Sequence, residues 1–279
     1  MTTPPQRLFS LEFFPARTPE GIDRLRATRR QVAQLKPAFC SVTFGAGGST
    51  RDGTLSTVLD FRAEGMPGVP HLSCMGGSRE SIGEVLAQYR AHGIRHVVAL
   101  RGDHPSGSGD VGDLRFASEL VAFIRRETGD WFKIDVAAYP ECHPQARSAQ
   151  DDLVAFRRKV DAGADSAITQ YFYNPDAYWH FVDACRGAGV TVPIVPGIMP
   201  ISSFSKLARF SDACGAEIPR WIRKQLEGYG DDVASIRAFG LDVVTELADG
   251  LLARGAPGLH FYTLNQAALT TTIWQRLGL

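Results

Sequence analysis

The chain has 279 residues, of which 44% are hydrophobic and 22% charged, with 30 basic and 30 acidic side chains. This much apolar material is enough for a folded core and excludes an intrinsically disordered chain. A net charge of zero lacks the basic excess of a nucleic-acid-binding protein, and no run approaches the roughly 18 uninterrupted apolar residues of a membrane span.

The start of the chain predicts a short flexible arm over residues 1–7, because it lacks the apolar stretch and cleavage site of a signal peptide. The five cysteines are widely spaced and form no C-x-x-C pair, so they indicate neither a disulfide framework nor a zinc cluster. The histidines show no metal-ligand spacing either. We therefore expect a cytoplasmic protein without a metal, with no nucleic-acid or membrane partner.

Short apolar runs of β type alternate with longer helical patterns along the chain. The predicted strands cover residues 8–14, 39–44, 69–74, 96–100, 133–138, 166–173, 192–197 and 259–262. The predicted helices cover residues 19–35, 51–64, 79–92, 114–128, 149–162, 176–188, 203–215, 219–229, 233–254 and 266–277. Three of these helices have a cap residue at their start, in the form of Thr18, Ser78 and Ser148.

Eight strand–helix units predict an α/β protein with a closed (β/α)8 TIM barrel, as a single catalytic domain over residues 1–279. Continuous apolar runs such as 96–100 are typical of parallel strands that are buried on both faces. The helical segments after the seventh strand predict an extra helix between units seven and eight. An open doubly wound sheet is the alternative, but no G-x-G-x-x-G follows the first strand.

In such barrels the active site lies at the carboxyl ends of the strands. Several predicted strands end in polar segments, which are GAGGST (45–50), RGDHP (101–105), YPECHP (139–144) and YTLN (262–265). Because parallel strands end at the same mouth, these segments are expected to converge there.

Glu12 is the most distinctive of these residues, because it lies in the first strand between Leu11 and Phe13. Burial favours the protonated form of a carboxyl group, which is the form that a general acid needs. A carboxylate paired with one of the many arginines explains the same pattern, so both interpretations stay open.

Two further features indicate an anionic ligand. The glycine-rich turn at 45–50 presents backbone N–H groups that suit a phosphate, although a tight strand–helix turn explains it equally. On the fifth-unit helix, Asp152 and Lys159 are seven residues apart with Arg158 adjacent, so this face suits a diphosphate or ribose. A solvated charged helix is the alternative.

Together these segments resemble the methylenetetrahydrofolate reductase family in its bacterial, single-domain form. The matching segments are SLEFFPARTPEG (10–21), SVTFGAGGSTRDGT (41–54), PHLSC (70–74), ALRGDHP (99–105), AAYPECHP (137–144), RRKVDAGADSAITQYFYN (157–174), VPGIMPISSF (195–204) and FYTLNQ (261–266). The resemblance implies a barrel that binds FAD and reduces methylenetetrahydrofolate to 5-methyltetrahydrofolate with NAD(P)H by a ping-pong hydride relay. It also implies a homo-oligomer that feeds methionine synthesis.

The resemblance assigns residue roles as well. Glu12 corresponds to the acid that protonates the folate, and Asp103 to the flavin-side carboxylate that favours the cationic iminium. Gln170 corresponds to a residue that holds the pterin, and Phe210 to an aromatic that packs on whichever substrate is bound. The FAD-binding positions correspond to Thr43, His71, Leu100, Arg101, Gly102, Asp103, Ala137, Tyr139, His143, Asp152, Arg158 and Lys159.

Three residues depart from the family pattern. Gln266 replaces an arginine that assists folate binding, Lys206 replaces a glutamine, and Ala155 replaces an asparagine on the FAD-facing helix. We expect Gln266 to weaken folate binding unless Lys206 supplies the missing cation. The alternatives are a relative with a diverged folate reaction and a non-catalytic folate or flavin sensor. A sensor needs neither Glu12 nor Asp103.

Overall fold

The computed structural model describes residues 7–44, 48–102 and 112–279, with side chains for all of these except 48–52. The strands of the described part form one closed parallel barrel in chain order, in which β1 pairs with both β2 and β8. They are β1 (Leu8–Phe13), β2 (Phe39–Val42), β3 (Gly68–Ser73), β4 (His96–Leu100), β5 (Lys133–Ala138), β6 (Ser166–Tyr171), β7 (Ile194–Ile198) and β8 (Gly258–Tyr262). The predicted TIM barrel is confirmed.

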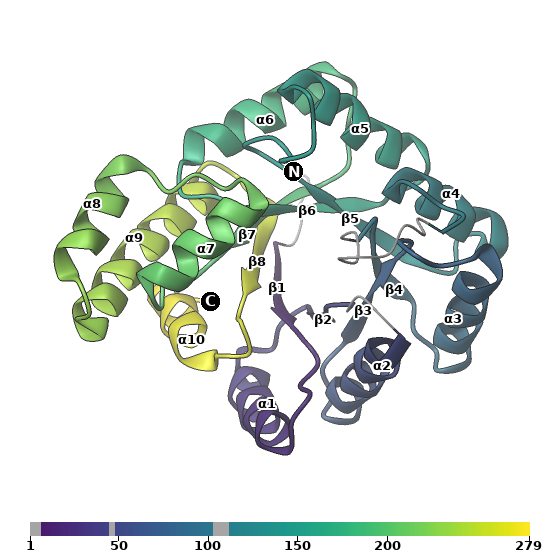
Figure 1. Cartoon of the computed structure of the whole chain (residues 1–279), viewed down its shortest axis with the longest axis horizontal. Helices are drawn as coiled ribbons and strands as arrows, with labels where there is room; N and C mark the ends of the chain where they lie inside the picture. Colours follow the sequence, from purple (N-terminus) through teal and green to yellow (C-terminus); the bar gives the residue numbers. More distant parts are fainter. Residues whose placement is uncertain (1–6, 45–47, 103–111) are drawn as a thin grey trace, which may run out of the picture.

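Helices surround this barrel on its outside (Figure 1). They are α1 (Pro19–Val32), the 3-10 turn η1 (Ala33–Leu35), α2 (Gly48–Ala63), α3 (Arg79–Ala91), α4 (Ala117–Thr128), α5 (Ala149–Asp161), α6 (Pro175–Gly187), α7 (Phe204–Cys214), α8 (Arg220–Tyr229), α9 (Val233–Ala253) and α10 (Ala267–Arg276). The side chains of Thr18, Ser78 and Ser148 each accept a backbone N–H bond at a helix start, so the predicted caps are confirmed.

Several element boundaries differ from the prediction. The helix α2 begins at Gly48, so the second half of the glycine-rich segment is helical, while residues 45–47 lie outside the described part. The strand β7 begins at Ile194, because Pro193 has no N–H for the ladder, although its carbonyl accepts from Ala167. The strand β6 ends at Tyr171, two residues earlier than predicted.

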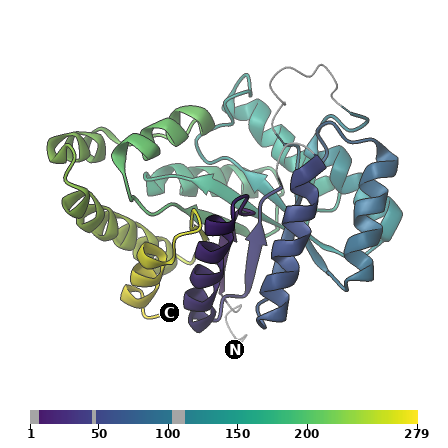
Figure 2. The same cartoon turned by 60° about the horizontal axis from the view of Figure 1, so that its bottom comes forward.

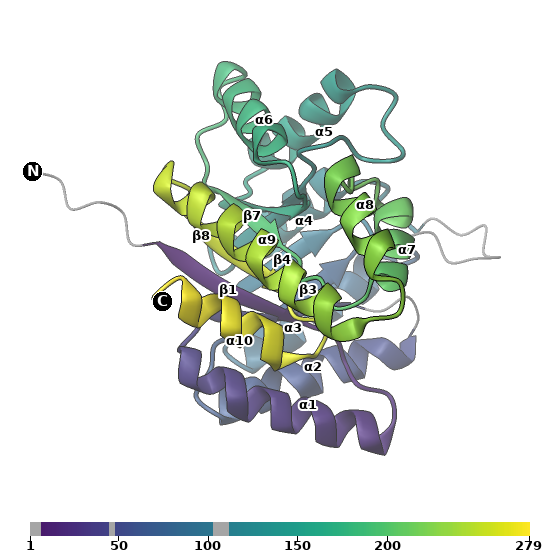
Figure 3. The ribbon, with the colours of Figure 1, turned by 90° about the vertical axis from the view of Figure 1, so that its left-hand side faces the viewer.

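Three helices, α7, α8 and α9, connect β7 to β8. Figures 2 and 3 show α7 and α8 at the end of the barrel where β1 ends, away from the C-terminus. This extra helical material therefore stands beside the carboxyl ends of the strands, where barrel active sites lie. In the described part of the chain, no helix combines the length and apolar character that a membrane crossing requires.

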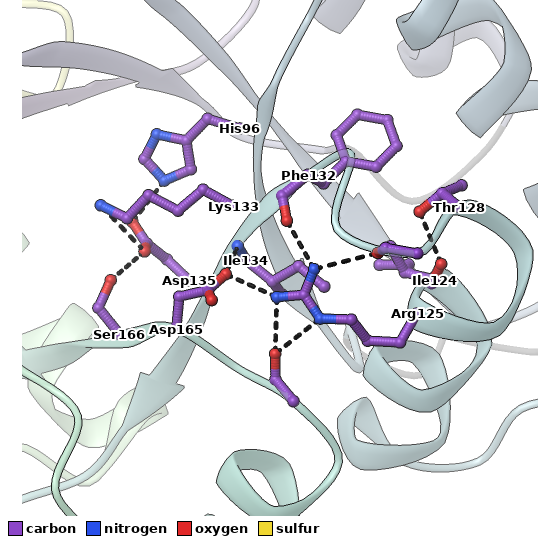
Figure 4. Close-up of polar contacts among 12 residues, drawn as sticks. His96, Ile124, Arg125, Thr128, Phe132, Lys133, Ile134, Asp135, Asp165 and Ser166 are labelled. Atoms are coloured by element: carbon purple, nitrogen blue, oxygen red, sulfur yellow. Dashed lines mark hydrogen bonds and ion pairs between the residues drawn. The ribbon is translucent and has the colours of Figure 1, made fainter.

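The opposite end of the barrel interior holds a polar cluster, which we call the lower cluster (Figure 4). His96 Nε2 lies 2.8 Å from Asp135 Oδ2, and Ser166 donates a short hydrogen bond to the other carboxylate oxygen. Lys133 Nζ lies 3.8 Å from Asp135. Burial opposes the ionisation of Asp135, but His96, Lys133 and Ser166 outweigh it and lower its pKa to about 2. The lower cluster thus holds a buried, ionised and fully bonded carboxylate.

Candidate active site

A second polar cluster lies inside the barrel nearer the carboxyl ends of the strands, and we call it the upper cluster. It consists of Glu12 from β1, His71 from β3 and His260 from β8. Glu12 Oε2 lies 3.5 Å from Nε2 of each histidine. These distances exceed ordinary hydrogen-bond lengths, and within the described part neither buried Nε2 atom has a hydrogen-bond partner. The cluster therefore has bonding capacity that it does not use.

Ser10 completes the upper cluster from below, since its Oγ lies 2.7 Å from His260 Nδ1. If Ser10 donates this bond, Nε2 of His260 carries a proton that faces Glu12. If Nδ1 donates instead, Nε2 presents a lone pair to which a protonated Glu12 can donate. The pair can thus adapt to either protonation state of the carboxyl group.

His71 is neutral in this cluster. Burial lowers the pKa of His71, and His260 lowers it further, against the opposing charge of Glu12. Among the described side chains, the ion-pair contacts of Glu12 go to the two histidines and not to an arginine. The arginine-paired alternative for Glu12 is therefore wrong for this part of the chain.

The end of β1 is held in place by the segment that follows β8. Thr263 donates its N–H and its hydroxyl to the Glu12 carbonyl, at 3.3 and 2.6 Å. The Asn265 amide both accepts from Phe14 N–H and donates to Phe14 carbonyl, at 3.0 and 2.9 Å. Asn265 has a φ of 56°, in the left-handed region that asparagine tolerates better than most residues. These bonds fix the backbone that carries Glu12.

Two cations lie near each other at the ends of β4 and β5, Lys159 of α5 and Arg101, and we call them the cationic pair. Lys159 of α5 donates to the Ala137 carbonyl at 2.5 Å. Burial, opposed by the charge of Asp152 and aided by nearby Arg101, lowers the pKa of Lys159 to about 8. Two cations close enough to repel each other favour an anionic ligand between them. The predicted grouping of Asp152 with Lys159 is thus present, whereas Arg158 is exposed.

Asp152 is bonded to the segment that follows β5. It is buried, and its Oδ2 accepts the His143 N–H at 2.8 Å. The His143 ring lies edge-on to the Tyr139 ring, with centroids 4.5 Å apart. The segment that follows β5 is therefore held by contacts with α5 and within itself, and it contains residues predicted to contact FAD.

The other residues predicted to bind FAD lie at the same mouth. Gly102 has a φ of 86°, and a side chain there would collide with Ser73 Oγ, so this turn requires glycine. The remaining partly buried residues at or next to these strand ends are Thr43, Leu100, Arg101 and Ala137. Asp103 lies outside the described residues.

The residues predicted to bind substrate come from three elements. Gln170 of β6 is partly buried, and its Oε1 accepts the Tyr171 N–H at 3.0 Å. Lys206 and Phe210 are four residues apart on α7, so they share one face of the helix; Lys206 is exposed and Phe210 is 38% exposed. Gln266 is exposed at the start of α10 and makes no side-chain cap bond.

Sequence reasoning did not select Ser10, His260, Thr263 or Asn265 as site residues. Ser10 and His260 meet because β1 pairs with β8 when the barrel closes. The only sequence signal for Thr263 and Asn265 was their place in the polar segment after the last strand. Within the described residues, no three His, Cys, Asp or Glu side chains are grouped so that they could hold a metal ion.

A closed barrel that gathers a carboxyl group, histidines and a cationic pair toward one mouth defines an α/β-barrel enzyme. The profile of the methylenetetrahydrofolate reductase family matches residues 3–278. The chain is 41% identical over 270 residues to 5,10-methylenetetrahydrofolate reductase of Escherichia coli (strain K12), covering 96% of this chain and 90% of that protein. The chain therefore belongs to the methylenetetrahydrofolate reductase family of oxidoreductases.

More distant comparisons agree with this family and fold. The chain is 40% identical to a probable methylenetetrahydrofolate reductase (NADH) of Oryza sativa subsp. japonica, covering 98% of this chain and 48% of that protein. A solved structure is similar with a TM-score of 0.69 at 16% identity, covering 98% of this chain and 94% of that one. It is an uncharacterized protein from Clostridium thermocellum that binds two copies of 5-methyl-5,6,7,8-tetrahydrofolic acid. At this identity the similarity concerns the fold alone.

Proposed function

We propose that this reductase uses FAD and NAD(P)H to convert 5,10-methylenetetrahydrofolate to 5-methyltetrahydrofolate by a ping-pong relay. The observation that carries the proposal is the upper cluster. In it the Glu12 carboxyl group faces two imidazoles at 3.5 Å, which is longer than an ordinary hydrogen bond, and both Nε2 atoms lack a partner among the described residues. A carboxyl group that lies inside the barrel near its mouth with hydrogen-bonding capacity left over is suited to general acid–base catalysis on a bound substrate.

The cationic pair supports FAD as the cofactor. Lys159 and Arg101 repel each other there, and a diphosphate between them would remove that repulsion. The ordered segment with Tyr139 and His143 would lie along the cofactor, while Asp152 holds that segment through the His143 N–H. Asp103, which we assign to the flavin side, lies outside the described residues. When bound, FAD supplies the hydride transfer chemistry, and the protein supplies orientation and electrostatics.

Glu12 is the proposed general acid of the folate half-reaction. Its proton would go to the folate and open the five-membered ring to an iminium, the form that accepts hydride. Afterwards the Glu12 carboxylate would take up a proton from solvent, to which its side chain is 19% exposed. Neutral His71 adds no positive charge beside the developing cation.

Gln170 is the proposed contact for the pterin, and the shared face of Lys206 and Phe210 is the proposed contact for the rest of the substrate. An exposed phenyl ring on a helix at the barrel mouth can pack on either a nicotinamide or a folate in turn. Gln266 stands at the same mouth, as the residue before α10. A single site that binds the two substrates in turn accounts for the ping-pong order.

The family resemblance extends the proposal to the cellular role. We assign the protein to the cytoplasm, as a homo-oligomer whose product feeds methionine synthesis. The plant relatives are named as NADH enzymes, which favours NADH among the two nicotinamides.

A flavin spectrum tests the proposal. The purified protein is expected to be yellow, to bleach under anaerobic NADH or NADPH, and to recover its colour when methylenetetrahydrofolate is added. The exposed Gln266 and Lys206 leave a second candidate, a different folate reaction on the same barrel. Bleaching without recovery on methylenetetrahydrofolate would favour that second candidate, and a colourless protein that binds no FAD would reject both.

A further inference from the structure

Glu141, in the segment between β5 and α5, is a half-buried carboxyl group that the proposed chemistry does not use. Its Oε2 accepts the backbone N–H of Glu217 at 2.8 Å, across 76 residues of sequence. Its Oε1 is buried and has no hydrogen-bond partner within the described part of the chain. Burial raises the pKa of Glu141, and the charge of Glu217 adds to this. A buried carboxylate oxygen without a hydrogen bond costs stability, which points to a role for this side chain other than stabilising the fold.

The same two segments are also packed closely together. Gly215 ends α7 with a φ of 75°, and a side chain there would lie 3.0 Å from the Pro144 ring and 3.6 Å from the Cys142 carbonyl. Cys142 itself has a φ of 78°, which is strained for a residue with a side chain. We call the contacts of Glu141 with Glu217 and of Pro144 with Gly215 the α7 clasp.

A bond from β6 fixes the same end of α7. The Tyr171 hydroxyl lies 3.0 Å from Ser211 Oγ, and Cys214 Sγ lies 3.6 Å from that hydroxyl. The last turn of α7 is thus fastened to the barrel, and the helix direction is set by where the clasp holds its end. Phe210 lies within this last part of the helix, and Lys206 one turn earlier.

The α7 clasp therefore joins the two sides of the proposed active site. The segment that contains Glu141 also contains Tyr139 and His143, which we assigned to FAD. The helix on the other side carries Lys206 and Phe210, which we assigned to the substrates. Only Glu141 makes a hydrogen bond directly between these segments among the described residues.

We infer that Glu141 is a positioning residue that couples the cofactor side of the site to the substrate side. Ordering of the segment 139–144 around FAD would be passed through the α7 clasp to α7, which would arrange Lys206 and Phe210 before folate or nicotinamide arrives. This inference rests on the proposed function for the identity of the ligands. It differs from that proposal because no contact with cofactor or substrate is assigned to Glu141.

Three variants separate the hydrogen bond from the charge. Glu141→Leu removes the acceptor, whereas Glu141→Gln keeps an acceptor of the same shape without the charge. Glu217→Gln is the matched control, because it changes the neighbouring side chain and leaves the backbone N–H that Glu141 binds. Amide hydrogen exchange of the peptide around 215–219 reports the clasp directly, in the FAD-loaded protein and after FAD is stripped.

The wild type is expected to exchange more slowly with FAD than without it. In Glu141→Leu this peptide is expected to exchange about tenfold faster and to respond no longer to FAD, because the Glu217 N–H loses its acceptor in the clasp. The KM values for folate and for NAD(P)H are both expected to rise several-fold, with kcat and FAD content within about twofold of wild type. Glu141→Gln and Glu217→Gln are expected to match the wild type.

The inference is overturned if FAD still slows exchange in Glu141→Leu, or if Glu141→Gln behaves like Glu141→Leu. Should Glu141→Leu fail to fold, Gly215→Ala opens the same clasp by pressing a methyl group against Pro144, and unchanged exchange there also overturns it. The exchange measurement needs no turnover. A wild type that fails to reduce methylenetetrahydrofolate would therefore refute the proposed function while leaving the coupling test intact.

Discussion

The upper and lower clusters inside the barrel contain the same kinds of side chain but differ in how they are bonded. In the lower cluster Asp135 contacts His96 at 2.8 Å and is also bonded by Ser166. In the upper cluster Glu12 stands 3.5 Å from Nε2 of each of two histidines, and neither Nε2 makes a hydrogen bond among the described residues. The difference shows that burial of a histidine and a carboxylate does not by itself define a site.

The number of donors explains the difference. Asp135 has a lysine, a histidine and a serine around it, and together they lower its pKa to about 2 despite burial. Glu12 faces two imidazoles only, and burial keeps His71 neutral by lowering its pKa. A saturated network stabilises the fold, whereas an unsaturated one remains free to bind a ligand or to exchange a proton.

Breaking the lower cluster is expected to have the largest effect on stability. Asp135→Asn removes the carboxylate to which His96 and Ser166 are bonded, and hydrogen bonds to a charged group are typically worth about 1.5–3 kcal/mol each. Urea unfolding at neutral pH measures this loss. Asp242→Asn is the control, since Asp242 is paired with Arg276 at an exposed site and is expected to cost no more than about 1 kcal/mol.

Acid titration sharpens the same comparison. Because the pKa of Asp135 is lower in the folded protein than its usual value near 4, its stabilisation is present above pH 4 and is lost as the pH falls toward 2. The free energy of unfolding of Asp135→Asn should therefore vary less over this range than that of the wild type. Equal acid sensitivity of the two proteins would show that Asp135 is not held ionised.

Removing a charge from the cationic pair is expected to give the next largest effect, which is on FAD affinity. A charge-assisted bond to a phosphate is worth about 1.5–3 kcal/mol, so Lys159→Ala should weaken FAD binding by roughly 10- to 100-fold. Arg157→Ala is the control, because Arg157 is exposed and paired with Asp161. Fluorescence titration of the FAD-stripped protein measures the affinities. If Lys159→Ala and Arg158→Ala both retain FAD normally, the nucleotide end of FAD binds elsewhere.

Proton exchange on FAD binding at the cationic pair has a defined sign. Since the pKa of Lys159 is about 8 without a bound anion, a diphosphate that favours the charged lysine should raise it. FAD binding at pH 8.5 is therefore expected to take up protons, as calorimetry in buffers of different ionisation enthalpy can detect. Lys159→Met should abolish this uptake, and uptake that persists would exclude Lys159 as its source.

Gln266 is expected to give the smallest effect. Gln266→Arg replaces a neutral amide with a charged fork, so it should lower the folate KM several-fold, about 1 kcal/mol, without changing the nicotinamide KM. If Lys206 already supplies the cation, Gln266→Arg gains little and Lys206→Ala becomes the harmful change. Steady-state kinetics of both variants decide between these outcomes. An unchanged folate KM in both would place the two residues outside the folate site.

The barrel could be predicted from sequence because each unit repeats the same local pattern, and caps such as Thr18 and Ser148 mark where helices begin. Glu12 was also predictable, since a carboxylate amid apolar neighbours is locally unusual. The partners of Glu12 were not, because His260 is 248 positions away and reaches it only when β8 closes on β1. Distant backbone bonds, such as that from Glu217 to Glu141, leave no local pattern at all.

The central claim is that Glu12 serves chemistry while Asp135 serves stability, and Glu12→Gln tests it most directly. Stopped-flow absorbance can follow each half-reaction separately in the FAD-loaded protein. In this variant we expect flavin reduction by NAD(P)H to proceed near the wild-type rate, whereas flavin reoxidation by methylenetetrahydrofolate is slowed about 100-fold or more. The unfolding free energy is expected to stay within about 1 kcal/mol of wild type. Equal slowing of both half-reactions, or normal rates in both, would contradict it.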